Sequence, residues 1–144
     1  MHLIRSFEPE NAALVGWGVR VMLVTRDGRD GLVSRRLAGI GGQVESLPDL
    51  GTALSLIADD PFGYSLVVIE CDAFGGVADV RRRVAMQDES ALRVPVILVS
   101  RDCPVQVFPA DRGAPVMLRA PLSAVSLRVG FEHALRDRLA QRAV

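Results

Sequence analysis

The chain has 144 residues, of which 49% are hydrophobic, and its 17 basic side chains balance 17 acidic ones. A chain of this length fits one domain, because folding at this size buries roughly 68–70% of the surface that the unfolded chain exposes. The charge balance argues against the basic field typical of nucleic-acid binding. No apolar run approaches the about 18 residues of a membrane span, and no signal-peptide pattern begins the chain, so we expect a soluble, cytoplasmic protein without membrane association.

Short apolar runs alternate with segments of helical periodicity from residue 19 onward, which is the pattern of β-α units around a parallel sheet. The predicted strands are Val19–Thr25, Gln43–Leu47, Ser65–Glu70, Val94–Ser100 and Val116–Arg119. The first, third and fourth are nearly continuous Val, Ile and Leu runs, as expected for strands buried on both faces. We therefore place these three strands at the centre of the sheet.

Helices are predicted where apolar residues recur at helical spacing. Between the strands these residues are Leu32, Val33, Leu37 and Ile40, then Leu50, Ala53, Leu54 and Ile57, then Val77, Val80 and Val84. A last helix is predicted over about Ser123–Gln141. One stripe of this helix, including Leu127 and Phe131, faces the sheet, and Val125 and Val129 form a second apolar ridge beside it.

Two regions depart from this alternation. Residues 1–18 precede the first strand and are predicted to be an N-terminal extension, with Trp17 near its end, while residues 19–144 form the domain. Between Ser100 and Val116 the sequence holds three prolines, which leave no room for a helix of normal length. The helix expected between the fourth and fifth strands is therefore predicted to be short, irregular or missing.

The segment 64–76, Tyr-Ser-Leu-Val-Val-Ile-Glu-Cys-Asp-Ala-Phe-Gly-Gly, resembles the third strand and following loop of a bacterial response-regulator receiver domain. The resemblance extends over about residues 19–142. It implies a flavodoxin-like, doubly wound α/β fold with a five-stranded parallel sheet of order 2-1-3-4-5, whose functional groups lie at the carboxyl ends of the strands. It also implies a role in two-component signal transduction.

Receiver domains end their first strand in two adjacent acidic residues that bind magnesium, and the resemblance places Thr25 and Arg26 at those positions. Magnesium requires hard oxygen ligands, which an arginine does not supply. The metal site is therefore predicted to be lost, and we expect no metal or other cofactor. In an alternative alignment, shifted by one residue, Asp27 supplies a single carboxylate.

The resemblance places Glu70 at the phosphoacceptor position, where the family has aspartate. One more methylene displaces the carboxylate from the position of in-line attack, so we expect no phosphorylation. Two hypotheses remain for Glu70: a strand-end carboxylate that is solvated or paired with Arg26, or a fixed imitation of the phosphorylated state. Asp72, two residues further on, is an alternative phosphate acceptor.

Two further family positions follow the last two strands. Ser100 matches the hydroxyl residue that bonds the phosphoryl group, and it is retained. Ala120 stands at the position of the family's lysine, and the chain has no lysine at all, since every basic residue is arginine. Pro121 matches the proline after that lysine and makes the Ala120–Pro121 bond a candidate for a cis peptide.

Other reactive side chains form no strong motif. His2 and His133 are too distant in the predicted fold for a metal site or a nucleophile–base pair. Cys71 and Cys103 are predicted to be buried inert thiols, with a redox pair as the alternative. The exposed arginines of the predicted helical faces are read as solvated, with binding of an acidic partner as the alternative: Arg35, Arg36, Arg81, Arg82 and Arg83.

The leading hypothesis is a stand-alone, degenerate receiver (a pseudo-receiver) that is not an enzyme and signals by protein–protein contact without phosphorylation. Its predicted contact surface, for a partner or a second copy, is formed by residues 101–115, the last strand and the last helix. A second hypothesis is a nucleotide or second-messenger binding module that uses Arg26, Arg101 and Arg119 to contact phosphates. A third is a phosphorelay receiver that accepts phosphate on Asp72.

Overall fold

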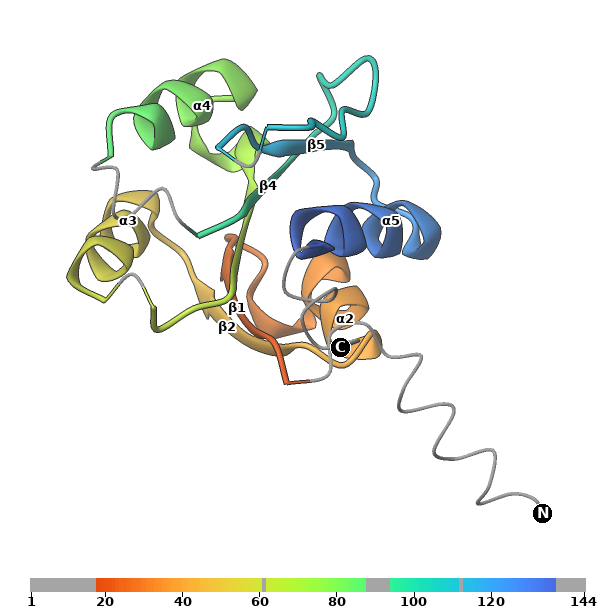
Figure 1. Cartoon of the computed structure of the whole chain (residues 1–144), viewed down its shortest axis with the longest axis horizontal. Coiled ribbons are helices and arrows are strands. Elements are labelled where there is room, and N and C mark those ends of the chain that lie inside the picture. The colour runs from red at the N-terminus through yellow and green to blue at the C-terminus, as the bar shows by residue number, and fades with distance from the viewer. Residues whose placement is uncertain (1–17, 61, 88–93, 112, 137–144) are drawn as a thin grey trace.

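A five-stranded parallel sheet lies between two pairs of helices (Figure 1). The computed structural model of the protein describes residues 18–60, 62–87, 94–111 and 113–136. The strands are β1 (Arg20–Val24), β2 (Gln43–Leu47), β3 (Leu66–Glu70), β4 (Val96–Ser100) and β5 (Val116–Arg119), in the order β2-β1-β3-β4-β5. The predicted flavodoxin-like α/β fold is confirmed, with the three most apolar strands at the centre. The predicted N-terminal extension lies almost wholly outside the described residues, so it stays a prediction.

The helices form one layer on each face of the sheet. One layer contains α2 (Leu32–Gly39) and α5 (Ala124–Ala134), and the other contains α3 (Leu50–Asp59) and α4 (Val77–Ala85). Two short 3-10 helices, η1 (Gly28–Asp30) and η2 (Cys71–Phe74), follow β1 and β3. None of the helices in the described part of the chain has the length and hydrophobicity that a membrane crossing needs.

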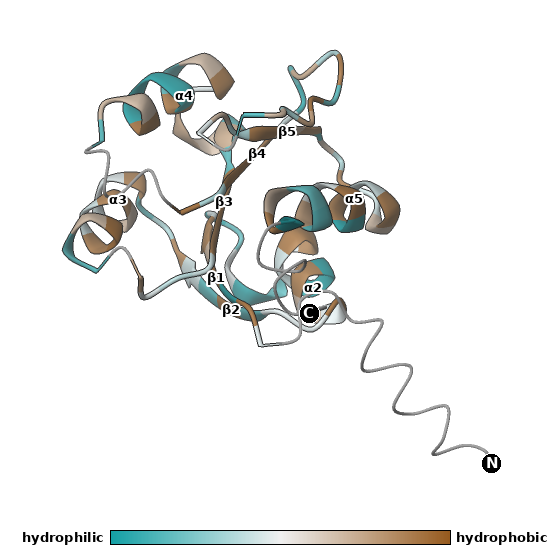
Figure 2. Ribbon diagram, viewed as in Figure 1, coloured by the Kyte–Doolittle hydropathy of each residue, from teal (hydrophilic) through white to brown (hydrophobic). Residues whose placement is uncertain are grey.

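Each central strand contributes side chains to two separate cores, because successive residues of a strand point to opposite faces. Val21 and Leu23 of β1 pack toward α2 and α5, whereas Met22 and Val24 pack toward α3 and α4. The central strands accordingly carry mostly hydrophobic residues, whereas the helices mix hydrophobic and hydrophilic residues (Figure 2). The continuous apolar runs in the sequence thus reflect burial on both faces of the sheet.

The connection between β4 and β5 contains no helix among its described residues, 101–111 and 113–115. Val107 instead forms an antiparallel bridge with Met117, with both N···O distances at 2.9 Å. The Arg119 guanidinium donates to the carbonyl oxygens of Cys103, at 3.0 Å, and Pro104. An extended segment therefore runs along the edge of β5. The three prolines of this region predicted only that a helix of normal length would not form.

Helix α5 begins at Ser123, whose hydroxyl accepts a hydrogen bond from the Ser126 N–H at 3.0 Å. Its Leu127 and Phe131 side chains are fully buried against the sheet. Val125 and Val129, the predicted second ridge, remain 72% and 45% exposed. The helix thus anchors one face and leaves another apolar face uncovered by the described residues.

Candidate functional site

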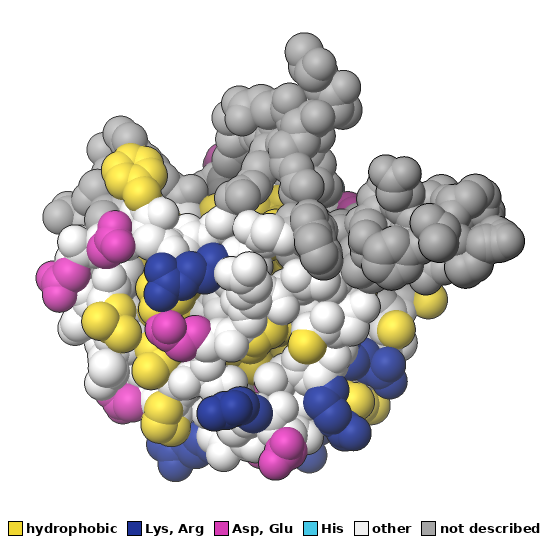
Figure 3. All heavy atoms as spheres, turned by 90° about the horizontal axis from the view of Figure 1, so that it is seen from below, with side chains coloured by type: hydrophobic (Ala, Val, Ile, Leu, Met, Phe, Trp, Pro, Cys, Tyr) yellow, Lys and Arg dark blue, Asp and Glu magenta, His cyan; other side chains and the backbone are white. Residues whose placement is uncertain are grey.

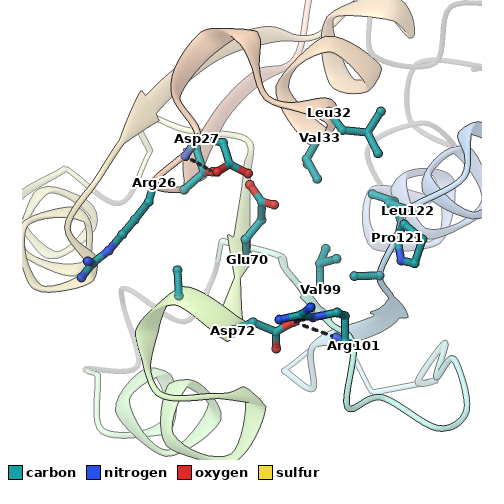
Figure 4. A pocket seen from close by; sticks show the side chains of 13 residues that line it. Arg26, Asp27, Leu32, Val33, Glu70, Asp72, Val99, Arg101, Pro121 and Leu122 are labelled. Atoms are coloured by element: carbon teal, nitrogen blue, oxygen red, sulfur yellow. Dashed lines mark hydrogen bonds and ion pairs between the residues drawn. The ribbon is translucent and has the colours of Figure 1, made fainter.

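A cavity of about 470 Å³ opens at the carboxyl ends of the strands, where the predicted site residues converge. Parallel strands end at the same edge of a sheet, so residues far apart in sequence meet there. The lining residues come from the segments after β1, β3, β4 and β5 and from the start of α2 (Figure 4): Thr25, Arg26, Asp27, Leu32, Val33, Glu70, Asp72, Ala73, Val99, Arg101, Ala120, Pro121 and Leu122. The positions that the sequence singled out after β1, β3 and β5 therefore share one cavity.

Asp72 is held by the end of β4 through both of its carboxylate oxygens. The Ser100 hydroxyl donates to Asp72 Oδ1 at 2.6 Å, and the Arg101 backbone N–H donates to Oδ2 at 2.9 Å. Arg101 Nε approaches the same oxygen at 3.4 Å. Burial raises the pKa of Asp72, but these hydrogen bonds outweigh it and lower the pKa below its usual range. Asp72 is therefore an ionised carboxylate bound in place by its own chain.

The local backbone explains why Asp72 reaches this position. Strands β3 and β4 are neighbours, and Glu70 pairs with Val99 in their register. The chain turns into η2 immediately after Glu70, so Asp72 lies over the end of β4. Ser100 is only 1% exposed, and its hydroxyl also accepts from the Asp102 N–H at 3.1 Å. No sequence pattern joined Asp72 to Ser100. The predicted adjacency of the strands that precede these two residues was the signal that could have done so.

Glu70 lies half-buried at the end of β3, and its carboxylate points toward the carboxylate of Asp27 (Figure 4). Burial is the largest influence that raises the pKa of Glu70, and the negative charges of Asp27 and Asp72 raise it further. A hydrogen bond from the Thr25 hydroxyl opposes these effects only in part. Glu70 is thus a carboxylate in a partly dry, negatively charged setting.

The prediction that Arg26 forms an ion pair with Glu70 is wrong. The Arg26 side chain points away from Glu70 (Figure 4). Its Cζ lies 5.3 Å from the centroid of the Phe74 ring. Thr25 and Arg26 point to opposite sides, as neighbouring residues at a strand end do, and the buried Thr25 takes the side toward Glu70. An exposed guanidinium over an aromatic ring also keeps its hydration, which burial beside Glu70 would remove.

Asp27, rather than Arg26, brings its carboxylate to the cavity beside Glu70. The Asp27 N–H donates to Thr25 Oγ1 at 3.0 Å, and this local turn folds the chain back after β1. The geometry therefore matches the alternative alignment in which Asp27 supplies a single carboxylate. Within the described ranges there is no group of three or more His, Cys, Asp or Glu side chains that could hold a metal ion. The residues present do not fit the magnesium site of the receiver family.

The β5 side of the cavity is apolar. The Ala120–Pro121 peptide bond is cis, and the Ala120 N–H donates to the Ser100 carbonyl at 3.1 Å. The Ala120 methyl group supplies no charge to this side of the cavity. Pro121 and Leu122 continue this wall, and Leu122 is only 2% exposed. One side of the cavity thus carries carboxylates and the other carries aliphatic groups.

The remaining candidate residues, His133, Cys71 and Cys103, do not line the cavity. His133 contacts the Pro109 carbonyl oxygen, and its ring meets Phe108 edge-on with centroids 5.9 Å apart; His2 lies outside the described residues. Cys71 and Cys103 are both free and buried, and burial raises the pKa of Cys71 to about 12. A thiol with that pKa is protonated at neutral pH, which favours the inert-thiol interpretation over a redox pair.

Arginine and acidic side chains are interspersed on the face seen in Figure 3, with hydrophobic and uncharged groups between them. Arg82 of α4 pairs with Asp79 one turn earlier on the same helix. Exposed pairs of this kind contribute little to stability. This face offers no large field of one charge, in line with the equal numbers of acidic and basic residues.

Comparison with solved structures shows similarity to the receiver domain of a sensor histidine kinase from Pseudomonas aeruginosa, whose structure has a magnesium ion coordinated in its active-site cleft. The match has a TM-score of 0.62 at 16% sequence identity and covers 82% of this chain and 98% of that domain. No protein-family model matches the chain, and no curated protein shows a significant match. The fold is therefore the receiver fold, as the sequence resemblance implied.

Proposed function

We propose that this protein is a receiver-type domain of two-component signalling that acts by binding another protein and is not phosphorylated. The observation that carries the proposal is the engagement of Asp72 by the Ser100 hydroxyl, at 2.6 Å, and by the Arg101 N–H. By the family resemblance, that hydroxyl bonds the phosphoryl group of a phosphorylated receiver. In this chain an internal carboxylate already uses it.

We therefore propose Asp72, rather than Glu70, as the residue that permanently imitates the phosphorylated state. A carboxylate brings about −1 charge and two acceptor oxygens, whereas a phosphoryl group brings about −1.5 to −2 charge and three. Asp72 satisfies the hydrogen-bond donors at the end of β4 with this smaller charge, without a metal ion. The domain would then present one surface constantly, and its output would depend on which partner occupies that surface.

We expect no phosphorylation when the protein is incubated with acetyl phosphate and magnesium, measured as an unchanged intact mass. Glu70 is displaced by one methylene, and Asp72 is already held by Ser100 and Arg101. The cavity lining contains no lysine, and the segment after β1 supplies it with one carboxylate, that of Asp27, in place of an adjacent acidic pair. A receiver domain with a complete acidic site, treated in parallel, serves as the positive control. A phosphoryl group mapped to Asp72 would support the phosphorelay hypothesis and overturn this one.

The nucleotide-binding hypothesis receives less support from the same geometry. Arg101 approaches Asp72, Arg119 donates to backbone carbonyls of the β4–β5 connection, and Arg26 points away from the cavity. None of these three arginines therefore directs an unengaged guanidinium into the cavity. Asp27 and Glu70 would repel a phosphate group placed there.

The β5–α5 apolar surface is our proposed contact site for a partner or a second copy of this chain. It is formed by the exposed side chains of Val105, Val107, Phe108, Val125 and Val129. Val125, Val129 and His133 follow one another at helical spacing on α5, and His133 contacts Phe108 of the extended segment. The two halves of the surface are therefore continuous, and apolar patches of this kind often mark interfaces.

We expect the intact protein to self-associate through the β5–α5 apolar surface, because a symmetric dimer is the commonest way to bury such a patch. Light scattering should give a mass above the 15.5 kDa of one chain. The double substitution Val125→Asp and Val129→Asp should return the mass to that of a monomer. Leu56→Asp, at an exposed apolar position on α3, is the matched control and should not change the assembly.

A variant that lacks residues 1–16 separates two explanations of a monomeric intact protein. If the N-terminal extension covers the β5–α5 apolar surface within one chain, its removal should produce a dimer. A monomer in both proteins, with no partner recovered, would refute the interface.

A further inference from the structure

The cavity at the carboxyl edge of the sheet combines two chemistries that the proposed function does not use. Asp27 and Glu70 direct carboxylates into it from the ends of β1 and β3. Val33 and Leu122, which are 4% and 2% exposed, belong to the aliphatic groups of its lining, together with Pro121. A volume of about 470 Å³ is sufficient for a small organic group.

The charges that face this cavity leave a local excess of negative charge. Arg101 is paired with the third carboxylate, that of Asp72. The Arg26 guanidinium lies over Phe74 and points away. Asp27 and Glu70 thus point toward one another with no ion pair to a described cation, and the nearby charge of Asp27 is one of the causes that raise the pKa of Glu70. A cation placed between them would relieve this repulsion.

The shape and donor set select among cations. The described residues bring together no group of three or more His, Cys, Asp or Glu side chains here, so a metal ion would take most of its ligands from water. An ammonium group needs only hydrogen-bond acceptors, and it has three donors to share between two carboxylates. The aliphatic wall suits the methylene chain that carries such an ammonium group, because long cationic side chains bury their stems against apolar surface.

We propose that this cavity binds a primary ammonium group on an unbranched aliphatic chain, supplied either by a free alkylamine or by a lysine side chain of a partner protein. The ammonium lies between Asp27 and Glu70, and its methylenes lie along Val33, Pro121 and Leu122. Ala120, with its small side chain, belongs to the cavity lining on the β5 side. This site goes beyond the proposed function and does not depend on whether the protein is phosphorylated.

The test is an NMR-detected titration of the full-length protein at low salt with n-butylammonium, and with n-butanol as its uncharged counterpart. We expect n-butylammonium to shift the backbone resonances of Thr25, Asp27 and Glu70 in a saturable manner, and n-butanol to bind at least tenfold more weakly. Asp27→Asn and Glu70→Gln should each weaken n-butylammonium binding about tenfold or more. Asp102→Asn, in the exposed loop after β4, should leave it unchanged. Added salt should weaken binding because it screens the carboxylates.

Two further measurements, with a lysine analogue as the ligand and with an Ala120→Lys variant, identify the source of the ammonium group and test its position. Nα-acetyl-lysine methylamide that binds as well as n-butylammonium supports a partner's lysine, whereas binding of the free amine alone supports a small alkylamine. Ala120→Lys should block both ligands, since its own ammonium reaches the same cavity. Three results would each overturn the proposal. They are equal binding of n-butanol and n-butylammonium, the absence of any saturable resonance shift, and resonance shifts that magnesium produces and n-butylammonium does not. A mass increase with acetyl phosphate would contradict the proposed function but not this site.

Discussion

Asp72→Ala is expected to destabilise the protein by about 1–3 kcal/mol at neutral pH, the largest effect we expect from a single change at the site. The substitution removes the acceptor of the Ser100 hydroxyl, whose side chain is 1% exposed, and of the Arg101 N–H. A buried donor left without a partner costs free energy, and hydrogen bonds to a charged group are among the stronger ones. The end of β4 should loosen together with the loop that follows it.

Urea denaturation at pH 7 measures this change as a lower midpoint with an unchanged m value. Asp102→Ala is the matched control, because the Asp102 backbone N–H, not its side chain, bonds to Ser100. Hydrogen exchange should accelerate at the Arg101 amide in Asp72→Ala only. If Asp72→Ala changes stability by no more than about 0.5 kcal/mol, as an ordinary surface substitution does, the bound carboxylate contributes nothing and the imitation hypothesis fails.

The effect of Asp72→Ala should also depend on pH. The pKa of Asp72 is lowered in the folded protein, because hydrogen bonds from Ser100 and Arg101 outweigh the effect of burial. Its stabilising contribution is therefore complete above its unfolded-state pKa, near 3.8, and is lost as the pH falls through the lower folded-state pKa. The two proteins should differ most at neutral pH and converge in strong acid.

Glu70→Gln is expected to stabilise the protein at neutral pH by about 0.2–1 kcal/mol, the range typical of interactions between partly exposed charges. Burial, and after it the charges of Asp27 and Asp72, oppose the ionisation of Glu70 and raise its pKa. Glutamine removes the charge and keeps an acceptor for the Thr25 hydroxyl. The cavity should therefore lose its repulsion without losing its shape.

The sign of the pH dependence separates this explanation from a packing effect. The pKa of Glu70 is raised in the fold, so its favourable, protonated contribution is complete below the unfolded-state value of about 4.5 and is lost as the pH rises through the higher folded-state pKa. The advantage of Glu70→Gln, measured as melting temperature between pH 4 and pH 8, should therefore grow with pH. The control is Glu132→Gln, an exposed carboxylate on α5 with Arg128 at 3.7 Å. A pH-independent gain would point to packing instead.

The sheet could be predicted closely from local pattern. The bounds of β2 and β5 are those predicted, and the other three predicted strands extend one or two residues beyond the observed ones. Burial on both faces requires long apolar runs on β1, β3 and β4, so their central position could be predicted from these runs alone. The prolines between Ser100 and Val116 likewise excluded a normal helix, because proline lacks the N–H that a helix interior requires.

The candidate site could be predicted only as a set of positions. Thr25, Glu70, Ala120 and Pro121 line one cavity, because every parallel strand ends at the same edge. Their contacts were not predictable in this way. The positive charge of Arg26 suggested an ion pair with Glu70. Successive side chains at a strand end point to opposite sides, however, and Arg26 points toward Phe74.

The sequence by itself determined the order of the elements, the central strands and the absence of any lysine, since these depend on residue type and spacing. Only the tertiary structure decided that Asp72, rather than Glu70, engages Ser100 and Arg101, and that Asp27 joins Glu70 in the cavity. Both outcomes depend on turns of a few residues after β1 and β3, namely the turn that the Asp27 N–H closes on Thr25 Oγ1 and the η2 turn after Glu70. Periodicity reports which face of an element is buried, but it carries no information about where a side chain beyond the end of a strand will point.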